Sequence, residues 1–416
     1  MRREAVANIA AFVATVVVCT ALALLFSVAV DLSFWVFSHV DHVAILLPAV
    51  GFATVLYYDL ARVPFGTATG SVIESLRQAT AKAREVNGEE GAEYEVPPAL
   101  IPMIFLGTCL TILCGGSVGK EAGALQMSMS AAAAIRRLFH VKTRHLTFLA
   151  SCGMAAALAV LLGMPLASAV LAIELMRGFD CRVRDLAGVL LAALAGSACA
   201  QALGVQGLVP VSHVVLPAIA QAPQFLLVVV ACAAAGALFC FVVVRGKQLI
   251  AKYVAPIWVA PVVGGVLAAA LLLLTPDAAS LSGTGMNYVA AALQGSVASP
   301  YFLGKLLFTA FLLVHGFKGG EIMPTMCIGA TCGCWVATLV GLDPSFGAVV
   351  GIVAGLASAA NCPLAAALLG AELLGVAGIP WVVGGALVAF ACTIRLSLYG
   401  NTYSLAALLP RLRRVR

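Results

Sequence analysis

The chain reads GGSVGKEAG at residues 115–123, and this glycine-rich break in an apolar sequence decides the fold. An apolar run precedes it and a helix-forming run follows it, so its backbone amides would begin a helix inside a membrane. Helix N-termini bind anions. A phosphate-binding loop is excluded, because that motif needs Gly at 114 and Ser or Thr at 121, where Cys114 and Glu121 stand. The stretch therefore indicates an anion site at membrane depth.

Composition excludes a soluble protein. Of the 416 residues, 62% are hydrophobic and 10% are charged, against roughly a quarter charged in ordinary soluble domains. The mean hydropathy is +1.06. Apolar stretches long enough to cross a bilayer recur at 6–30, 43–60, 225–244 and 258–274. We predict one all-α, multi-pass domain over residues 1–416, embedded in the lipid bilayer of the cell membrane.

The formal net charge of +6 does not indicate a nucleic-acid partner, because the basic residues lie in short loops, at 2–3, 136–144, 245–252 and 411–416. Positive-inside topology explains this distribution better, and we expect both termini to be cytoplasmic. The cysteines and histidines lack the spacing of a metal site. We therefore expect no metal and no cofactor.

The two halves of the chain repeat each other. Residues 164–175 align with residues 362–373 at an offset of 198, and residues 116–121 align with residues 316–321 at an offset of 200. A Gly-, Pro- and Val-rich break at 204–224 separates the halves, so repeat one covers about 1–203 and repeat two about 223–416. Paired, broken segments of this kind indicate a transporter whose site lies at the repeat interface near mid-membrane.

Glu121 is an ionisable residue at a predicted helix start in an apolar chain. A charge at that depth costs several kcal/mol unless it is partnered or hydrated, and such residues are functional by default. The alternative is a carboxylate that only caps its own helix. The same two readings apply to Glu321.

These motifs resemble those of the CLC family of anion channels and transporters. GKEAG at 119–123 resembles the family's Gly-Arg/Lys-Glu-Gly-Pro signature, and GEIMP at 320–324 resembles its Gly-x-Phe-x-Pro signature. Tyr403, within GNTYS at 400–404, matches the tyrosine that helps to hold the central anion. The resemblance implies two inverted-topology repeats whose broken helices meet at a mid-membrane anion site. It also implies a homodimer with one pore in each subunit.

The resemblance assigns roles to individual residues. Glu121 becomes the external gating glutamate, which competes with the anion and carries the proton. Tyr403 becomes the inner gate or ligand. The main chain around Gly119, and around Glu321, Ile322 and Met323, supplies anion donors, which attract an anion without trapping it as a full positive charge would.

Two departures from the family pattern bear on the site. The family's Gly-Ser-Gly-Ile-Pro motif is loosely represented by TGSVIE at 69–74, which makes Ser71 the candidate hydroxyl ligand. AIELMR at 172–177 resembles the family's Ile-Glu-Glu-Met-Arg, but Leu175 replaces the second glutamate. That glutamate is the internal proton acceptor of the chloride/proton exchangers, so their usual proton route is missing here.

The third departure is Glu321, which stands where chloride members have an apolar residue. GFKGGEIMP at 316–324 resembles the Gly-Gly-Glu-Val-Thr-Pro variant of the fluoride/proton branch, with Met323 in place of threonine. Repulsion by a bound anion favours the protonated form of a neighbouring carboxyl group. The protonated group could then donate a hydrogen bond to a small, basic anion such as fluoride.

We therefore expect an anion/proton antiporter that exports fluoride in exchange for protons. A chloride/proton exchanger or a passive chloride channel is the alternative. An intramembrane enzyme is not expected, because the sequence contains no His-Glu-x-x-His, Gly-x-Gly-Asp or Gly-x-Ser-Gly motif. The chain ends soon after Tyr403, so we expect none of the C-terminal cytosolic nucleotide-binding domains found in many family members.

Overall fold

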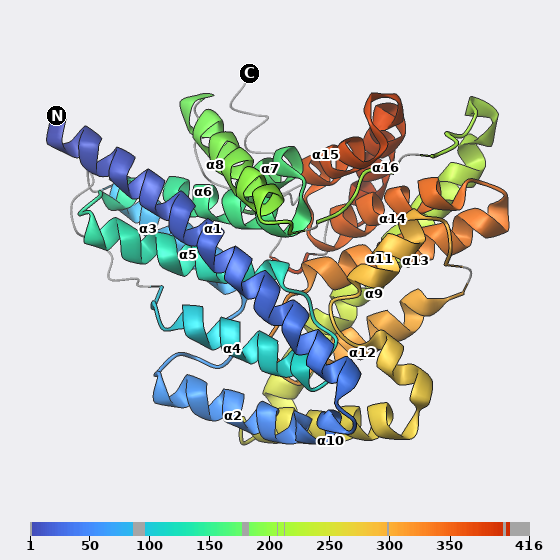
Figure 1. Ribbon diagram of the computed structural model, residues 1–416, viewed down its shortest axis with the longest axis horizontal. Coiled ribbons are helices and arrows are strands. Elements are labelled where there is room, and N and C mark those ends of the chain that lie inside the picture. Colours follow the sequence, from blue (N-terminus) through green and yellow to red (C-terminus); the bar gives the residue numbers. More distant parts are fainter. Residues whose placement is uncertain are drawn as a thin grey trace. The chain divides into compact units, whose positions relative to one another are not determined.

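The computed structural model describes residues 2–85, 96–176, 183–205, 207–211, 213–297, 299–393 and 397–399 (Figure 1). The chain forms two compact units. Unit 1 comprises residues 1–208, 253–284 and 315–321, and unit 2 comprises residues 209–252, 285–314 and 322–416.

Helices make up both units. Those of unit 1 are α1 (Arg2–His39), α2 (Leu47–Leu60), α3 (Thr69–Glu85), α4 (Leu100–Leu113), α5 (Glu121–Leu138), α6 (Leu146–Leu162), α7 (Pro165–Leu175), α8 (Val183–Ala202) and α10 (Val259–Leu274). Those of unit 2 are α9 (Ala222–Tyr253, except its last residue), α11 (Met286–Leu293), α12 (Tyr301–Val314), α13 (Ile322–Val340), α14 (Pro344–Ala359), α15 (Pro363–Leu374) and α16 (Ile379–Thr393). Short 3-10 turns lie at Val43–Leu46, Thr143–His145, Ile219–Gln221, Pro276–Leu281 and Val376–Gly378.

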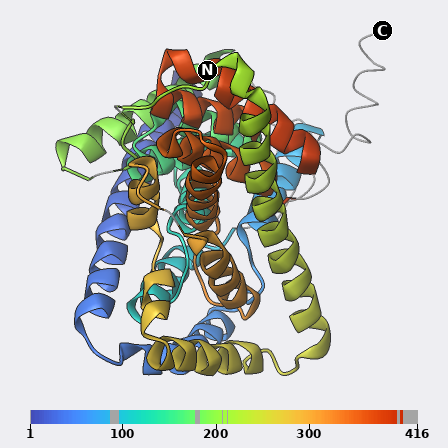
Figure 2. The ribbon, with the colours of Figure 1, turned by 90° about the vertical axis from the view of Figure 1, so that its right-hand side faces the viewer.

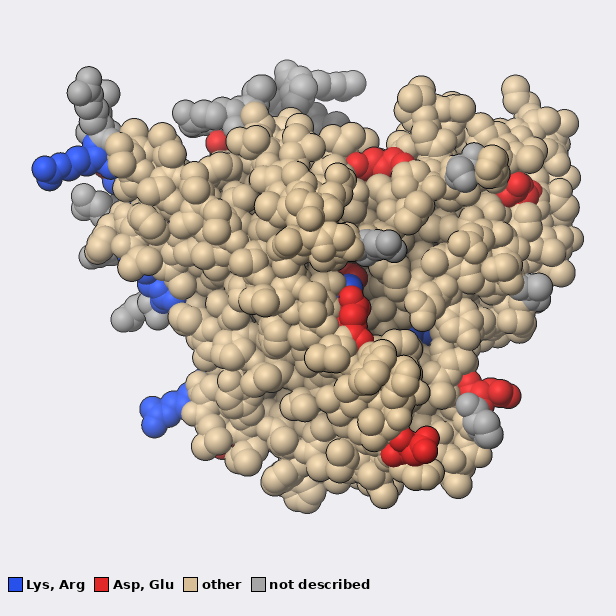
Figure 3. Space-filling model, in the orientation of Figure 1, with Lys and Arg blue, Asp and Glu red and all other residues tan. Residues whose placement is uncertain are grey.

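The all-α, multi-pass prediction is confirmed. Seven helical segments within the described ranges are long and apolar enough to cross a membrane, and Val43–Leu60 matches a predicted stretch. Six shorter apolar helices of 10–17 residues accompany them, as expected for broken helices. On the face drawn in Figure 3, charged side chains of the described residues are few, which suits a lipid-facing surface.

In unit 1, α6 is the central helix. It packs against α1, α5, α7 and α8, and nearly all of its residues are buried. A second contact joins α2 and α10, which lie side by side (Figures 1 and 2). There Gly51 and Gly265 allow close approach, because a Cβ at either position would lie within 2.7 Å of backbone atoms of the other helix. The core of unit 1 is therefore apolar, and α6 and the helices packed against it form most of it.

The local backbone repeats, with one correction to the register. Three landmarks are 201 residues apart: the last residues of α4 and α12 (Leu113 and Val314), two left-handed glycines (Gly115, φ 85°, and Gly316, φ 89°), and the first residues of α5 and α13 (Glu121 and Ile322). The sequence alignment at 200 is therefore wrong by one residue. Glu121 corresponds to Ile322, and Glu321 corresponds to Lys120.

The second repeated motif is in the predicted register. The helices α7 and α15 begin at Pro165 and Pro363, which are 198 residues apart. A left-handed residue precedes each helix by two positions, Gly163 with φ 72° and Asn361 with φ 59°. Proline favours the first turn of a helix, because its fixed φ is helical and its missing N–H is not needed there.

In unit 2, the closest helix pair is α13 and α14. Gly329 and Gly333 of α13 face Gly347 and Gly351 of α14, and a Cβ at any of the four would collide with atoms of the facing helix, most often a glycine carbonyl oxygen. Small residues four apart let backbones approach closely within a membrane, where packing drives helix association.

We predict that Gly351→Ala destabilises the protein by about 1–3 kcal/mol, because the new methyl group meets the Gly329 carbonyl and cannot be accommodated without backbone movement. Thermal unfolding in detergent measures the loss. Gly384→Ala in α16 is the matched control, because no atom lies within 4 Å of its added Cβ. Equal melting temperatures for the two variants would contradict the close contact.

Candidate functional site

Two loops, one from each repeat, are joined within unit 1. Residues 114–120 lead into α5, and residues 315–321 lead toward α13. Gly119 N donates to Gly320 O at 2.7 Å, and Gly320 N donates to Gly119 O at 2.7 Å. This antiparallel bridge is the only β-pairing among the described residues. It fixes the main chain directly before Lys120-Glu121 and directly before Glu321.

Glycines make this approach possible. Gly115 takes a left-handed conformation after α4, and Gly116 N then donates to Thr111 O at 2.7 Å, which closes the end of that helix. A Cβ on Gly320 would lie 2.8 Å from Ala122 N and 3.0 Å from Ala122 Cβ. Gly320 therefore lies against the first turn of α5, and any side chain there would push the two loops apart.

Glu121 is the first residue of α5 and is fully buried. The first amides of an α-helix have no acceptor within the helix, and they carry the positive end of its dipole. Glu121 thus lies at a buried helix start, as the sequence predicts. The same amides are suited to an anion.

Glu321 directly follows the bridged Gly320 and is partly exposed. Ile322 and Met323 form the first turn of α13, and their side chains are buried. The predicted main-chain donors thus stand at a helix start. Tyr403, the remaining predicted ligand, lies outside the described residues.

Lysines flank both glutamates and are held by other groups. Lys120 is 5% exposed, and its Nζ lies 2.8 Å from Ser27 Oγ and 3.3 Å from Asp31 Oδ1, both in α1. Lys318 Nζ donates to Phe65 O at 2.7 Å and lies over the rings of Tyr58 and Phe65. These contacts anchor each loop to the rest of unit 1.

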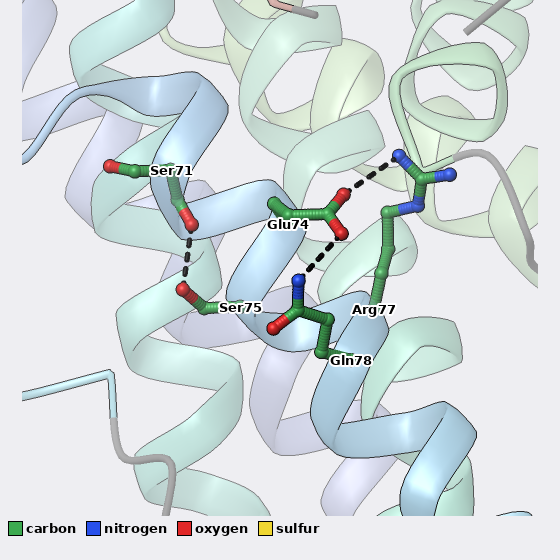
Figure 4. A network of polar contacts seen from close by, with 5 residues as sticks. All are labelled: Ser71, Glu74, Ser75, Arg77 and Gln78. Carbon is green, nitrogen blue, oxygen red and sulfur yellow. Dashed lines mark hydrogen bonds and ion pairs between the residues drawn. The ribbon is translucent and has the colours of Figure 1, made fainter.

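The predicted hydroxyl ligand, Ser71, lies on the exposed face of α3. Its Oγ donates to Ala68 O at 2.7 Å, and Ser75 Oγ donates to Ser71 O at 2.6 Å. Figure 4 shows Ser71 in a polar network with Glu74, Ser75, Arg77 and Gln78.

Two residues earlier, Thr69 is buried, with 2% exposure, at the first position of α3. Its Oγ1 accepts a hydrogen bond from Gln126 Nε2 of α5 at 2.7 Å. Thr69 is thus buried against α5, whereas Ser71 is exposed. Both hydroxyl residues belong to the loose motif TGSVIE at 69–74, from which sequence reasoning selected Ser71.

A buried lysine was also missed. Lys305 lies in the middle of the apolar helix α12 and is completely buried, next to Gly285 and Cys327 in unit 2. A lone lysine within an apolar run is a recognisable signal, because an ionisable residue at membrane depth is functional by default.

The sequence comparisons identify relatives of the chain. The family model described as voltage gated chloride channel matches residues 52–393. A chloride/fluoride channel protein of Pseudomonas syringae pv. tomato is 30% identical over 369 residues, which cover 86% of this chain and 76% of that protein.

Solved structures share the fold. The crystal structure of a CLC-type fluoride/proton antiporter gives a TM-score of 0.81 at 23% identity, covering 95% of this chain and 98% of that one. A slow cyanobacterial Cl⁻/H⁺ antiporter gives a TM-score of 0.75 at 18% identity, covering 99% and 98%. The fold, the glutamates at the paired loops and the family model that spans most of the sequence lead to one conclusion. The chain belongs to the voltage-gated chloride channel, or CLC, family.

Proposed function

We propose that the protein is an anion/proton antiporter that exports fluoride in exchange for protons. The observation that carries this proposal is the position of Glu321. It follows the bridged Gly320, which packs on Ala122, the residue after Glu121. The main chain therefore brings two carboxyl-bearing residues to the first turn of α5, and each can carry a proton.

The anion is held mainly by dipoles. The amides in the first turn of α5 are donors with no acceptor in their own helix. Ile322 and Met323, the donors that the family resemblance implies, begin α13. The Gly119 amide, also predicted as a donor, is already bonded to Gly320 O. Thr69 adds a hydroxyl in place of Ser71, and Tyr403 supplies the inner ligand that the family resemblance implies. Dipoles of this kind bind an anion weakly enough to release it, which transport requires.

Glu121 acts as the gate. Its carboxylate and the anion compete for the same amides at the start of α5, because both are negative and the helix dipole attracts either one. Protonation removes the charge of the carboxylate and frees the amides for the anion. Proton binding and anion binding are thereby linked.

Glu321 supplies the second proton carrier. An ionised carboxylate beside a bound anion repels it. Glu321 is therefore compatible with anion binding when its carboxyl group is protonated during the transport cycle. The protonated group is also a hydrogen-bond donor for fluoride. It takes the role of the internal acid that Leu175 replaces in the sequence.

The relatives support this assignment through their names. A CLC-type fluoride/proton antiporter shares the fold, and the Pseudomonas relative is described as a chloride/fluoride channel protein. The second description favours a passive channel as the rival function.

We further propose a homodimer of inverted repeats with both termini in the cytoplasm.

The first functional prediction concerns the gate. Glu121→Gln mimics the protonated carboxyl group, so fluoride efflux should persist while fluoride-driven proton uptake falls to background. Vesicles reconstituted with each protein, with a fluoride electrode and a pH electrode, measure both fluxes. Glu74→Gln is the control, because Glu74 is an exposed carboxylate of α3 bonded to Gln78 and Arg77. Normal proton uptake by Glu121→Gln would contradict the gating role.

The second prediction separates the antiporter from a chloride channel. Glu321→Gln should abolish proton-coupled fluoride flux, because a proton carrier is lost, and should leave the melting temperature near that of the wild type. Fluoride and chloride efflux are compared with and without a proton gradient. Equal chloride and fluoride transport by the wild type, unchanged in Glu321→Gln, would rule out the fluoride assignment.

A further inference from the structure

Gln126 and Thr69 form a buried polar pair between α5 and α3. Gln126 Nε2 and Thr69 Oγ1 are 2.7 Å apart, and the two residues are 9% and 2% exposed. An amide nitrogen can only donate, so the threonine oxygen is the acceptor in this bond. The single hydroxyl proton of Thr69 must then be donated elsewhere.

Thr69 does not donate this proton to the acceptor that a threonine within a helix commonly uses, the carbonyl oxygen four residues earlier. Several other buried threonines donate to the carbonyl oxygen four residues earlier in their helices, as Thr15, Thr54, Thr80, Thr111 and Thr331 do. Thr69 begins α3 and makes no hydrogen bond to the carbonyl oxygen of Phe65, four residues earlier, which accepts from Lys318. Among the described residues, no group accepts the Thr69 proton. A buried donor without an acceptor costs about 1–3 kcal/mol, so this proton is suited to a bound ligand.

The pair lies on a face of α5 that also meets the joined loops. Gln126 is four residues after Ala122, so the two side chains share one face of the helix. Ala122 is the residue against which Gly320 packs. The Thr69 hydroxyl is thereby held about one helical turn along the same face of α5 from the contact with Gly320, the residue before Glu321.

We propose that Gln126 is a positioning residue which, by donating to Thr69 Oγ1, commits the Thr69 hydroxyl proton to the transported anion. This inference rests on the proposed function, since the ligand is the halide that the protein carries. Without the amide, the hydroxyl oxygen gains a free acceptor site and the hydroxyl group can rotate. Its proton is then donated to the anion for only part of the time.

The test is a double-mutant cycle on fluoride affinity, measured by titration calorimetry on the purified protein. Thr69→Val, which removes the hydroxyl and keeps the shape, should weaken fluoride binding about tenfold or more. Gln126→Met should weaken it about threefold to tenfold, because the hydroxyl remains but is no longer oriented. The double variant should bind fluoride as Thr69→Val does, because Gln126 acts only through that hydroxyl. Thr69→Ser should retain affinity.

Thr80→Val is the matched control, because Thr80 is buried in the same helix and its proton already reaches Leu76 O at 2.9 Å. It should leave fluoride affinity unchanged. Additive losses in the double variant, or full affinity in Gln126→Met, would overturn the positioning role, whatever the melting temperatures are. If the wild type binds chloride and not fluoride, the substrate proposal fails, and the same cycle run with chloride decides the role of Gln126. If the wild type binds neither halide, both proposals are contradicted.

Discussion

The two main-chain hydrogen bonds between Gly119 and Gly320 are the constraint on which the site depends. They join loops about 200 residues apart in sequence and hold Glu121, two residues after Gly119, near Glu321, which directly follows Gly320. The bridge forms only because glycines remove the side chains that would collide, with Ala122 in the case of Gly320 and with Val118 in the case of Gly319. A helix start whose amides suit an anion is thereby fixed next to two glutamates.

The chemistry of the loops follows from dipoles and carboxyl groups. The neighbouring amines are held by other groups, Lys120 by Ser27 and Asp31 and Lys318 by Phe65. A lysine amine placed on the anion would bind it strongly and slow its release, whereas helix-start amides attract it moderately. In the proposed cycle, protonation of a glutamate changes the local charge by one unit, and this change links proton binding to anion binding.

Much of the fold could be predicted from the sequence. The length of the apolar stretches indicates which segments cross the membrane, and glycine or proline breaks indicate where helices are interrupted. The repeat around Pro165 and Pro363 was found in its correct register, since proline marks a helix start. The register at Glu121 was one residue out, because two glutamates matched in letters while the backbone pairs Glu121 with Ile322. Thr69 was passed over for Ser71, since burial depends on which face of α3 packs on α5, and a loose motif does not specify that.

The most direct test of the account is uphill proton movement by the wild-type protein in sealed vesicles. With a fluoride gradient, no initial pH gradient and the membrane potential clamped, fluoride leaving the vesicles should drive protons inward against their own gradient. An equal chloride gradient should drive far less. Fluoride movement without any proton movement would contradict coupled exchange and identify a passive channel.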